Sequence, residues 1–71
     1  MQVPQQHPIR GTLTRHLETR THQDFDIIVV GAQTLFVPAA LYEVLDELTC
    51  GDLVEAAYES EHRVVSLSPG R

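Results

Sequence analysis

Two apolar segments on either side of a glycine turn constrain the fold of this chain more than any other feature of its sequence. Residues 25–30 are Phe-Asp-Ile-Ile-Val-Val, residues 33–37 are Gln-Thr-Leu-Phe-Val, and Gly31 and Ala32 separate them. Both segments are rich in β-branched and aromatic side chains, so they predict the two strands of a β-hairpin. The two-residue connection predicts a type II′ turn in which Gly31 takes the positive φ angle.

The period of two along a strand divides the side chains of this hairpin between its two faces. Both faces are apolar, so the hairpin is expected to lie deep in the fold or to meet a partner, and which face is buried stays open. The two phenylalanines are expected to fill the core, because a chain of 71 residues has few large side chains to use. One face holds Phe25, Ile27, Val29, Thr34 and Phe36, and the other holds Ile28, Val30, Leu35 and Val37.

A further strand and a helix are expected on either side of the hairpin. Residues 9–18 alternate apolar or small side chains with polar ones, which predicts a half-buried strand, and the polar residues 19–24 predict a loop. Residues 39–48 follow Pro38 and predict the one clear helix, with Gly51 as its left-handed C-terminal cap. The helix is expected to bury Leu41, Val44, Leu45 and Leu48 and to turn Glu43, Asp46 and Glu47 toward water.

The last part of the chain predicts a second hairpin. Residues 53–59 and 62–67 are rich in valine and alanine and are joined by the polar Ser60 and Glu61. The expected organisation is therefore a flexible N-terminal arm over residues 1–8, a single domain over residues 9–67 and a C-terminal tail over residues 68–71.

Charge is unevenly distributed along the chain. The formal net charge is −5; residues 1–23 carry three arginines against one glutamate, whereas residues 24–71 carry nine acids against two arginines. An acidic surface weakens sequence-independent affinity for phosphate backbones, so broad binding of polyanions is disfavoured while a local basic edge remains available. Because there is neither a secretory signal nor an apolar stretch long enough for a membrane span, we expect no membrane association and, in a bacterial host, a cytoplasmic protein.

The pattern of reactive side chains predicts neither an enzyme nor a cofactor. Cys50 is the single cysteine and lies among acids at the expected helix C-terminus, a setting that does not activate a thiol. The four histidines lack the spacing of a zinc site, and no phosphate-binding or nucleophile motif is present. We therefore expect no catalytic residues, no metal and no cofactor.

The order of these elements, three strands, one helix and a closing hairpin, resembles the OB fold. The likeness rests on the opening strand with Gly11, the apolar hairpin, the helix, and residues 48–55 (Leu-Thr-Cys-Gly-Asp-Leu-Val-Glu). The resemblance implies a mostly β domain: a five-stranded OB-like barrel with one α-helix between strands 3 and 4. It also implies a ligand surface across strands 2 and 3, rimmed by two loops. On that basis the candidate binding residues for single-stranded nucleic acid are Arg15, Arg20, His22, Tyr58, His62 and Arg63.

Two other interpretations stay open. The apolar hairpin and acidic helix face also suit a protein-interaction adaptor or small subunit. Residues 34–38, a short helix and residues 51–55 are similar to the swapped-hairpin domain of AbrB-type regulators and MazE-type antitoxins, which implies a homodimer that binds DNA. Small barrels of the SH3 or Sm type remain a further architecture for a chain of this length.

Overall fold

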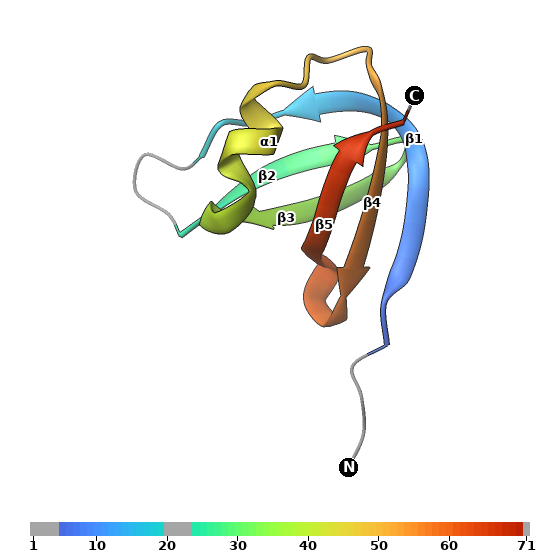
Figure 1. Ribbon diagram of the computed structural model, residues 1–71, viewed down its shortest axis with the longest axis vertical. Coiled ribbons are helices and arrows are strands. Elements are labelled where there is room, and N and C mark those ends of the chain that lie inside the picture. Colours follow the sequence, from blue (N-terminus) through green and yellow to red (C-terminus); the bar gives the residue numbers. More distant parts are fainter. Residues whose placement is uncertain (1–4, 20–23, 71) are drawn as a thin grey trace.

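The computed structural model describes residues 5–19 and 24–70, and it is mostly β (Figure 1). One short helix, α1, lies between the third and fourth of five strands, which confirms the expected order of elements. Two 3-10 turns, Ala39–Leu41 and Ser60–His62, precede α1 and β5. The elements are β1 (His7–His16), β2 (Phe25–Val30), β3 (Gln33–Pro38), α1 (Tyr42–Asp46), β4 (Leu53–Glu59) and β5 (Arg63–Pro69).

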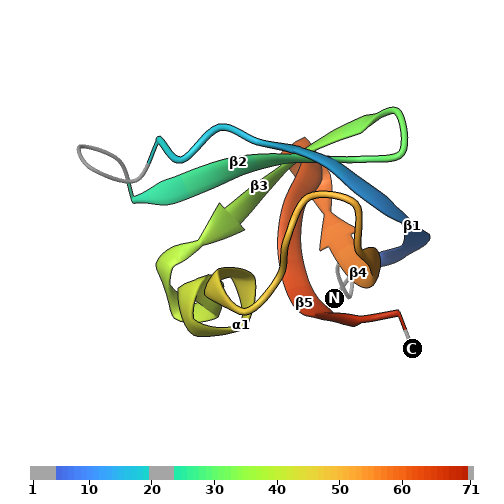
Figure 2. The same cartoon turned by 90° about the horizontal axis from the view of Figure 1, so that it is seen from above.

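The strands form one sheet in the order β1-β2-β3-β5-β4, and pairing of β4 with β1 closes it into a barrel. All neighbours are antiparallel except β3 and β5, which run parallel and meet at Phe36 and Arg63. Viewed from above, β2 and β3 form one side of the barrel and β4 and β5 the other, while β1 bends from one to the other (Figure 2). The β3–β5 seam is therefore where the two halves of the chain meet.

Strand β1 pairs with both sides of the barrel because it bends in the middle. Its first six residues pair with β4, and Leu13, Arg15 and His16 pair with β2. A bulge between Leu13 and Arg15 interrupts the alternation that the sequence predicts. As a result His16 points inward, and Leu17, which the alternation places on the same face as Leu13, is 43% exposed.

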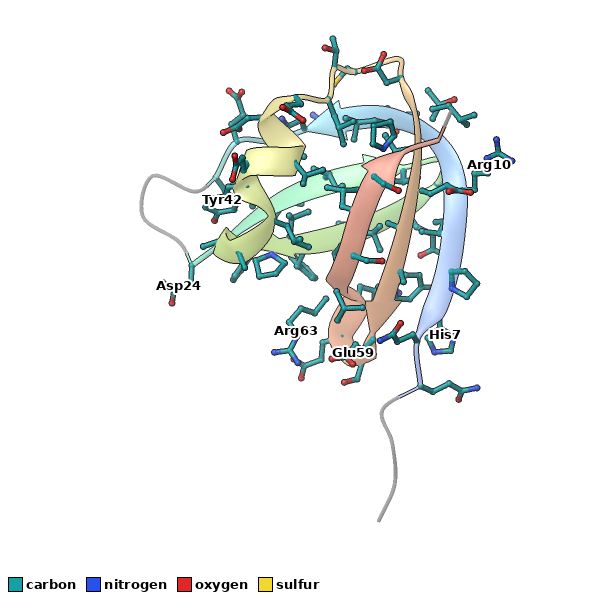
Figure 3. The ribbon with its side chains drawn as sticks, in the orientation of Figure 1. His7, Arg10, Asp24, Tyr42, Glu59 and Arg63 are labelled. Carbon is teal, nitrogen blue, oxygen red and sulfur yellow. The ribbon has the colours of Figure 1, made fainter. Side chains whose placement is uncertain are left out.

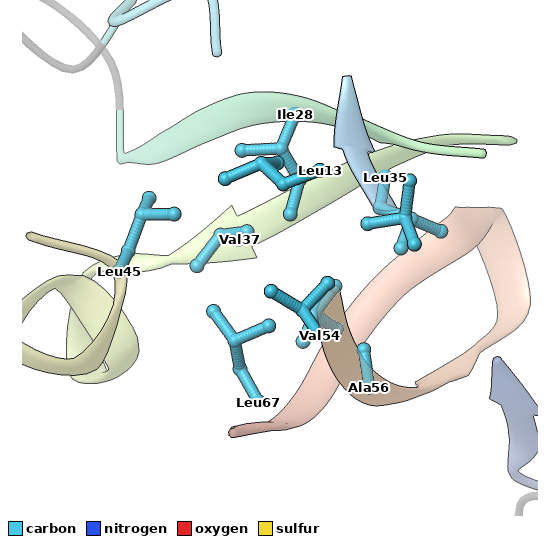
Figure 4. Close-up of a cluster of buried hydrophobic side chains, with 10 residues drawn as sticks. Leu13, Ile28, Leu35, Val37, Leu45, Val54, Ala56 and Leu67 are labelled. Atoms are coloured by element: carbon cyan, nitrogen blue, oxygen red, sulfur yellow. The ribbon is translucent and has the colours of Figure 1, made fainter. Parts of the chain in front are cut away.

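The core lies inside the barrel and is built from aliphatic side chains (Figure 4). The hairpin buries the face that carries Ile28 and Leu35, so the open question of its orientation is answered. Phe25 and Phe36 lie on the outer face, and the expectation that they fill the core is wrong. The physical reason is the alternation of side chains along each strand. Because Ile28 and Leu35 point into the barrel, Phe25 on β2 and Phe36 on β3 point out of it. The core comprises Leu13, Ile28, Val30, Leu35, Val37, Leu45, Val54, Ala56, Val64 and Leu67.

The helix is shorter than the expected range of 39–48. After Pro38 the chain makes a 3-10 turn over Ala39–Leu41 before α1 begins, and the N–H groups of Glu47 and Leu48 donate to carbonyls only three residues back. These tight bonds end the helix at Asp46. Gly51 is therefore no helix cap: with a φ of 103° it forms the turn before β4, and its N–H donates to the Leu13 carbonyl at 2.8 Å.

The ends of the ordered domain also differ from the expected bounds of 9–67. Strand β1 begins at His7 and β5 continues to Pro69. Gly70, expected in a tail, is buried: its N–H donates to the Leu53 carbonyl at 2.7 Å, and its carbonyl accepts from Arg10 at 2.9 Å. Residues 1–4 and 71 of the expected arm and tail lie outside the described residues. In residues 5–19 and 24–70, no helix combines the length and apolar character needed to cross a bilayer.

The turn between β4 and β5 holds Glu61 and His62 in the left-handed region, with φ angles of 64° and 59°. This conformation costs an L-residue about 1 kcal/mol and costs glycine little. We therefore expect Glu61→Gly to raise the free energy of unfolding by roughly 1 kcal/mol in urea denaturation. The matched control is Glu55→Gly in the regular part of β4, which is expected to lower stability by a similar amount. Equal losses from both substitutions would contradict the prediction.

Candidate binding site

A hollow of about 440 Å³ opens on the outer surface where β2, β3 and the start of β5 meet. Apolar rings form much of its wall, and charged side chains stand at its rim; Figure 3 shows Asp24 and Arg63 on this part of the molecule. The hollow lies on the strand pair that the sequence resemblance marks as a ligand surface. It is lined by Asp24, Phe25, Phe36, Pro38, Glu61 and Arg63.

The two phenylalanines form an edge-to-face pair. Phe36 is paired with Ile27 in the register of the hairpin, so its ring lies diagonally across from Phe25 on the same face. The ring centroids are 5.3 Å apart and the planes are inclined by 81°. Phe25 is 36% exposed, which leaves ring surface available to a further planar group.

Arg63 is fixed at the edge of the hollow by the backbone and by one carboxylate. It is the first residue of β5 and forms the parallel pair with Phe36. Its Nη2 donates to Oε1 of Glu59 at 3.3 Å, while the Arg63 side chain remains 64% exposed and that of Glu59 is 16% exposed. The guanidinium is therefore held beside the phenylalanine pair with several of its N–H donors facing water.

A second hollow of about 300 Å³ adjoins the first across the same arginine. It lies between the 3-10 turn that follows β3 and the start of β5. Pro38 and Arg63 line both hollows, so the two form neighbouring parts of one surface. The second hollow is lined by Pro38, Ala40, Leu41, Glu59, Arg63, Val64 and Val65.

The six candidate binding residues named from the sequence are not gathered in one place. Arg63 lines the hollow, whereas Arg15 is an exposed residue of β1 paired with Val29 and lines neither hollow. Arg20 and His22 lie outside the described residues. Tyr58 and His62 form a separate cluster.

That cluster is a stack of three rings beside the β4–β5 turn. The Tyr58 centroid lies 5.3 Å from His62, with planes inclined by 20°, and also 5.3 Å from His7 of β1, with planes inclined by 35°. Tyr58 is half-buried and packs against the core, while both histidines are exposed. The stack attaches the start of β1 to β4 and the turn.

Sequence reasoning favoured core positions for the two phenylalanines, and it did not single out Asp24, Pro38 or Glu61 as site residues. A signal was present, because the hairpin is apolar on both faces while the rest of the chain supplies one helix. A single short helix does not cover both faces of a sheet, so one apolar face had to remain on the surface.

A buried carboxylate lies at the opposite, inner face of β2. The Asp26 side chain is 0% exposed; its Oδ2 accepts from Nε2 of His16 at 2.6 Å, and its Oδ1 accepts from the N–H groups of Thr19 at 2.8 Å and Ile27 at 3.1 Å. Burial raises the pKa of the Asp26 carboxyl, but the hydrogen bonds from His16, Thr19 and Ile27 and the charge of a protonated His16 outweigh it and hold the pKa below its ordinary value. This network ties the end of β1 to β2.

Groups that carry metal or thiol chemistry do not come together in the described residues. Over residues 5–19 and 24–70, no three side chains of the His, Cys, Asp or Glu type gather as a metal site would require. Cys50 is exposed and free, in the turn before β4.

Comparison of the chain with protein-family models, with curated proteins and with solved structures finds no match to any of them.

Proposed function

We propose that the chain is a non-enzymatic binding module of the OB type that binds short single-stranded nucleic acid on the outer face of β2 and β3. The strand order, with its parallel β3–β5 seam and a helix between β3 and β4, supports the OB assignment, because that fold is a five-stranded Greek-key barrel. Closure of the sheet within one chain favours this architecture over a swapped hairpin.

The observation that carries the proposal is the exposed Phe25–Phe36 pair in the same hollow as the Arg63 guanidinium. Proteins that bind single strands combine aromatic rings, on which bases stack, with cations that contact the phosphates. In OB folds this combination lies on strands 2 and 3 and on the loops that flank them. The hollow takes its residues from β2, β3 and the β4–β5 turn, which are the corresponding positions.

The acids at the rim indicate which bases are preferred. Carboxylates repel phosphates, but Asp24 and Glu61 can accept hydrogen bonds from the exocyclic amino group of a base. Thymine and uracil lack such an amino group. We therefore expect cytosine-containing strands to bind more tightly than thymine-containing ones.

The test is a titration of isotope-labelled protein with a deoxycytidine hexanucleotide, followed by NMR. Binding is expected to shift the signals of Phe25, Phe36 and Arg63. Phe36→Ala is expected to weaken binding by at least about fivefold, because stacking contributes about 1–3 kcal/mol per base. The matched control is Leu17→Ala, an exposed apolar residue that does not line the hollow. Equal losses of affinity from the two variants would overturn the proposal. Absence of NMR shifts at millimolar concentrations of the hexanucleotide would also overturn it.

A second candidate function is docking of a basic protein segment, and the charge around the hollow favours it. Asp24, Glu59 and Glu61 stand against the single cation Arg63 among the residues that line the two hollows. Direct comparison of the two ligands separates the candidates, because the affinity for either a nucleic acid or a basic peptide falls as salt rises. Nucleic-acid affinity is expected to fall with a log–log slope of about −0.7 for each phosphate neutralised. A basic peptide that binds more tightly than the hexanucleotide would favour the adaptor, and a concentration-dependent mass in size exclusion would identify a second copy of the chain as partner.

A further inference from the structure

We propose that the two hollows form one site for a dinucleotide step, with one base in each hollow and the connecting phosphodiester on Arg63, and that Glu59 competes with this phosphate. The inference rests on the proposed function and adds to it the second hollow, the register of the strand and an internal competitor. The ligand surface on β2 and β3 ends at Pro38, so it does not by itself imply a second base site after that residue.

The arrangement of the lining residues matches the chemistry of two linked nucleotides. A single-stranded nucleic acid alternates planar apolar bases with anionic phosphates. Here a hollow with two aromatic rings and a hollow with aliphatic walls share Arg63 as a lining residue. Arg63 is the one cation lining either hollow among residues 5–19 and 24–70, so it is the side chain there that can neutralise a phosphate.

The second hollow suits a base packed on aliphatic side chains. Leu41 and Val65 supply apolar walls, Ala40 is small, and Pro38 presents a ring edge that the two hollows share. This part of the site comes from the segment after β3 and from β5. Its position extends the β2–β3 face toward α1.

Glu59 already accepts from one N–H donor of the guanidinium that the phosphate would contact. Its Oε1 accepts from Arg63 at 3.3 Å, and the Glu59 side chain is the more buried of the two. A phosphate approaching Arg63 therefore meets a carboxylate that repels it and that competes for the same guanidinium. Removal of the Glu59 charge is expected to strengthen binding of a ligand with a phosphate at this position and to leave a ligand without one unaffected.

The experiment compares Glu59→Gln with Glu55→Gln. Both variants remove one carboxylate beside an arginine, since Glu55 lies 3.7 Å from Arg10, and both change the net charge equally. The probes are the dinucleotide dCpdC and the nucleoside deoxycytidine, titrated by NMR. Glu59→Gln is expected to tighten dCpdC binding about three- to tenfold and to change deoxycytidine binding less than twofold, whereas Glu55→Gln changes neither by more than twofold.

The outcomes separate this inference from the proposed function. Shifts at Phe25 and Phe36 with none at Ala40, Leu41 and Val65 would overturn the dinucleotide register and leave the first hollow as a base site. Absence of shifts with either probe would overturn both. Equal tightening by the two glutamine variants would show a general charge effect and refute the role of Glu59. Arg63→Ala gives an independent reading: it is expected to reduce dCpdC affinity by a larger factor than deoxycytidine affinity.

Discussion

Replacement of His16 by alanine is expected to lower the free energy of unfolding by about 1.5–3 kcal/mol, because it removes a hydrogen bond to a buried carboxylate. The variant leaves the Asp26 carboxylate in the barrel without its 2.6 Å hydrogen bond. A domain of this length has a total stability of only about 4–10 kcal/mol. Urea denaturation monitored by circular dichroism measures the loss.

Two further variants separate the charge of Asp26 from its hydrogen bonds and provide an exposed control. Asp26→Asn keeps an oxygen that can accept from Thr19 and Ile27 but removes the charge, so it is expected to cost about 1.5–3 kcal/mol. Asp24→Asn, an exposed carboxylate two residues away, is expected to change stability by less than about 0.5 kcal/mol. If His16→Ala costs no more than Asp24→Asn, the buried pair does not stabilise the fold.

The same network makes stability depend on acidity. The pKa of Asp26 is lower in the folded protein than its ordinary value of 3.8, so the folded state binds this proton less readily than the unfolded chain. Its stabilising contribution is complete above pH 3.8 and is lost as the pH falls through the lowered folded value. Asp26→Asn is expected to flatten the acid limb of the stability profile, and Asp24→Asn is not.

The second large effect is expected from Leu45→Ala, which should lower the free energy of unfolding by about 2–5 kcal/mol. Leu45 is fully buried and is the one buried residue of α1. A five-residue helix has no stability of its own, so packing against the barrel holds it. Figure 4 shows Leu45 reaching from the helix toward the core between β2 and β5.

Two neighbours on the same segment provide the controls. Val44 is half-buried, so Val44→Ala is expected to cost about 1 kcal/mol, and Glu47→Ala at an exposed position is expected to cost less than about 0.5 kcal/mol. Thermal and urea unfolding of the three variants gives the ranking. A loss from Leu45→Ala that does not exceed that from Val44→Ala would mean that the helix is not anchored by this side chain.

Local patterns predicted the strands well because each pattern reports on the backbone directly. The alternating and apolar residues of β2 and β4 gave their bounds to the residue, and Gly31, with a φ of 61°, takes the positive φ expected of the turn. The β1 bulge was not predictable from the local sequence, because it arises where β1 changes from pairing with β4 to pairing with β2. The helix length failed similarly, since hydrophobic spacing does not reveal that a 3-10 turn precedes α1.

The site was harder to predict than the fold because it depends on which face of the hairpin turns outward. Of the candidate residues, the sequence identified Arg63 but placed Phe25 and Phe36 in the core. The alternation is identical for either orientation of the hairpin. Only the complete barrel, with Ile28 and Leu35 opposite the side chains of β4 and β5, decides between them.

The closed strand order has a consequence for how quickly the chain can fold. Hairpins β2–β3 and β4–β5 join neighbouring segments, but β1 must pair with β4, more than forty residues later in the chain, before the ring closes. Closing such a long loop costs entropy before the new contacts repay it, and topologies dominated by distant pairings fold in milliseconds to seconds. We therefore expect the pairing of His7 with Tyr58 at the far end of β1 to form late in folding, and until it forms the outer edge of β4 keeps its backbone N–H and C=O groups unpaired.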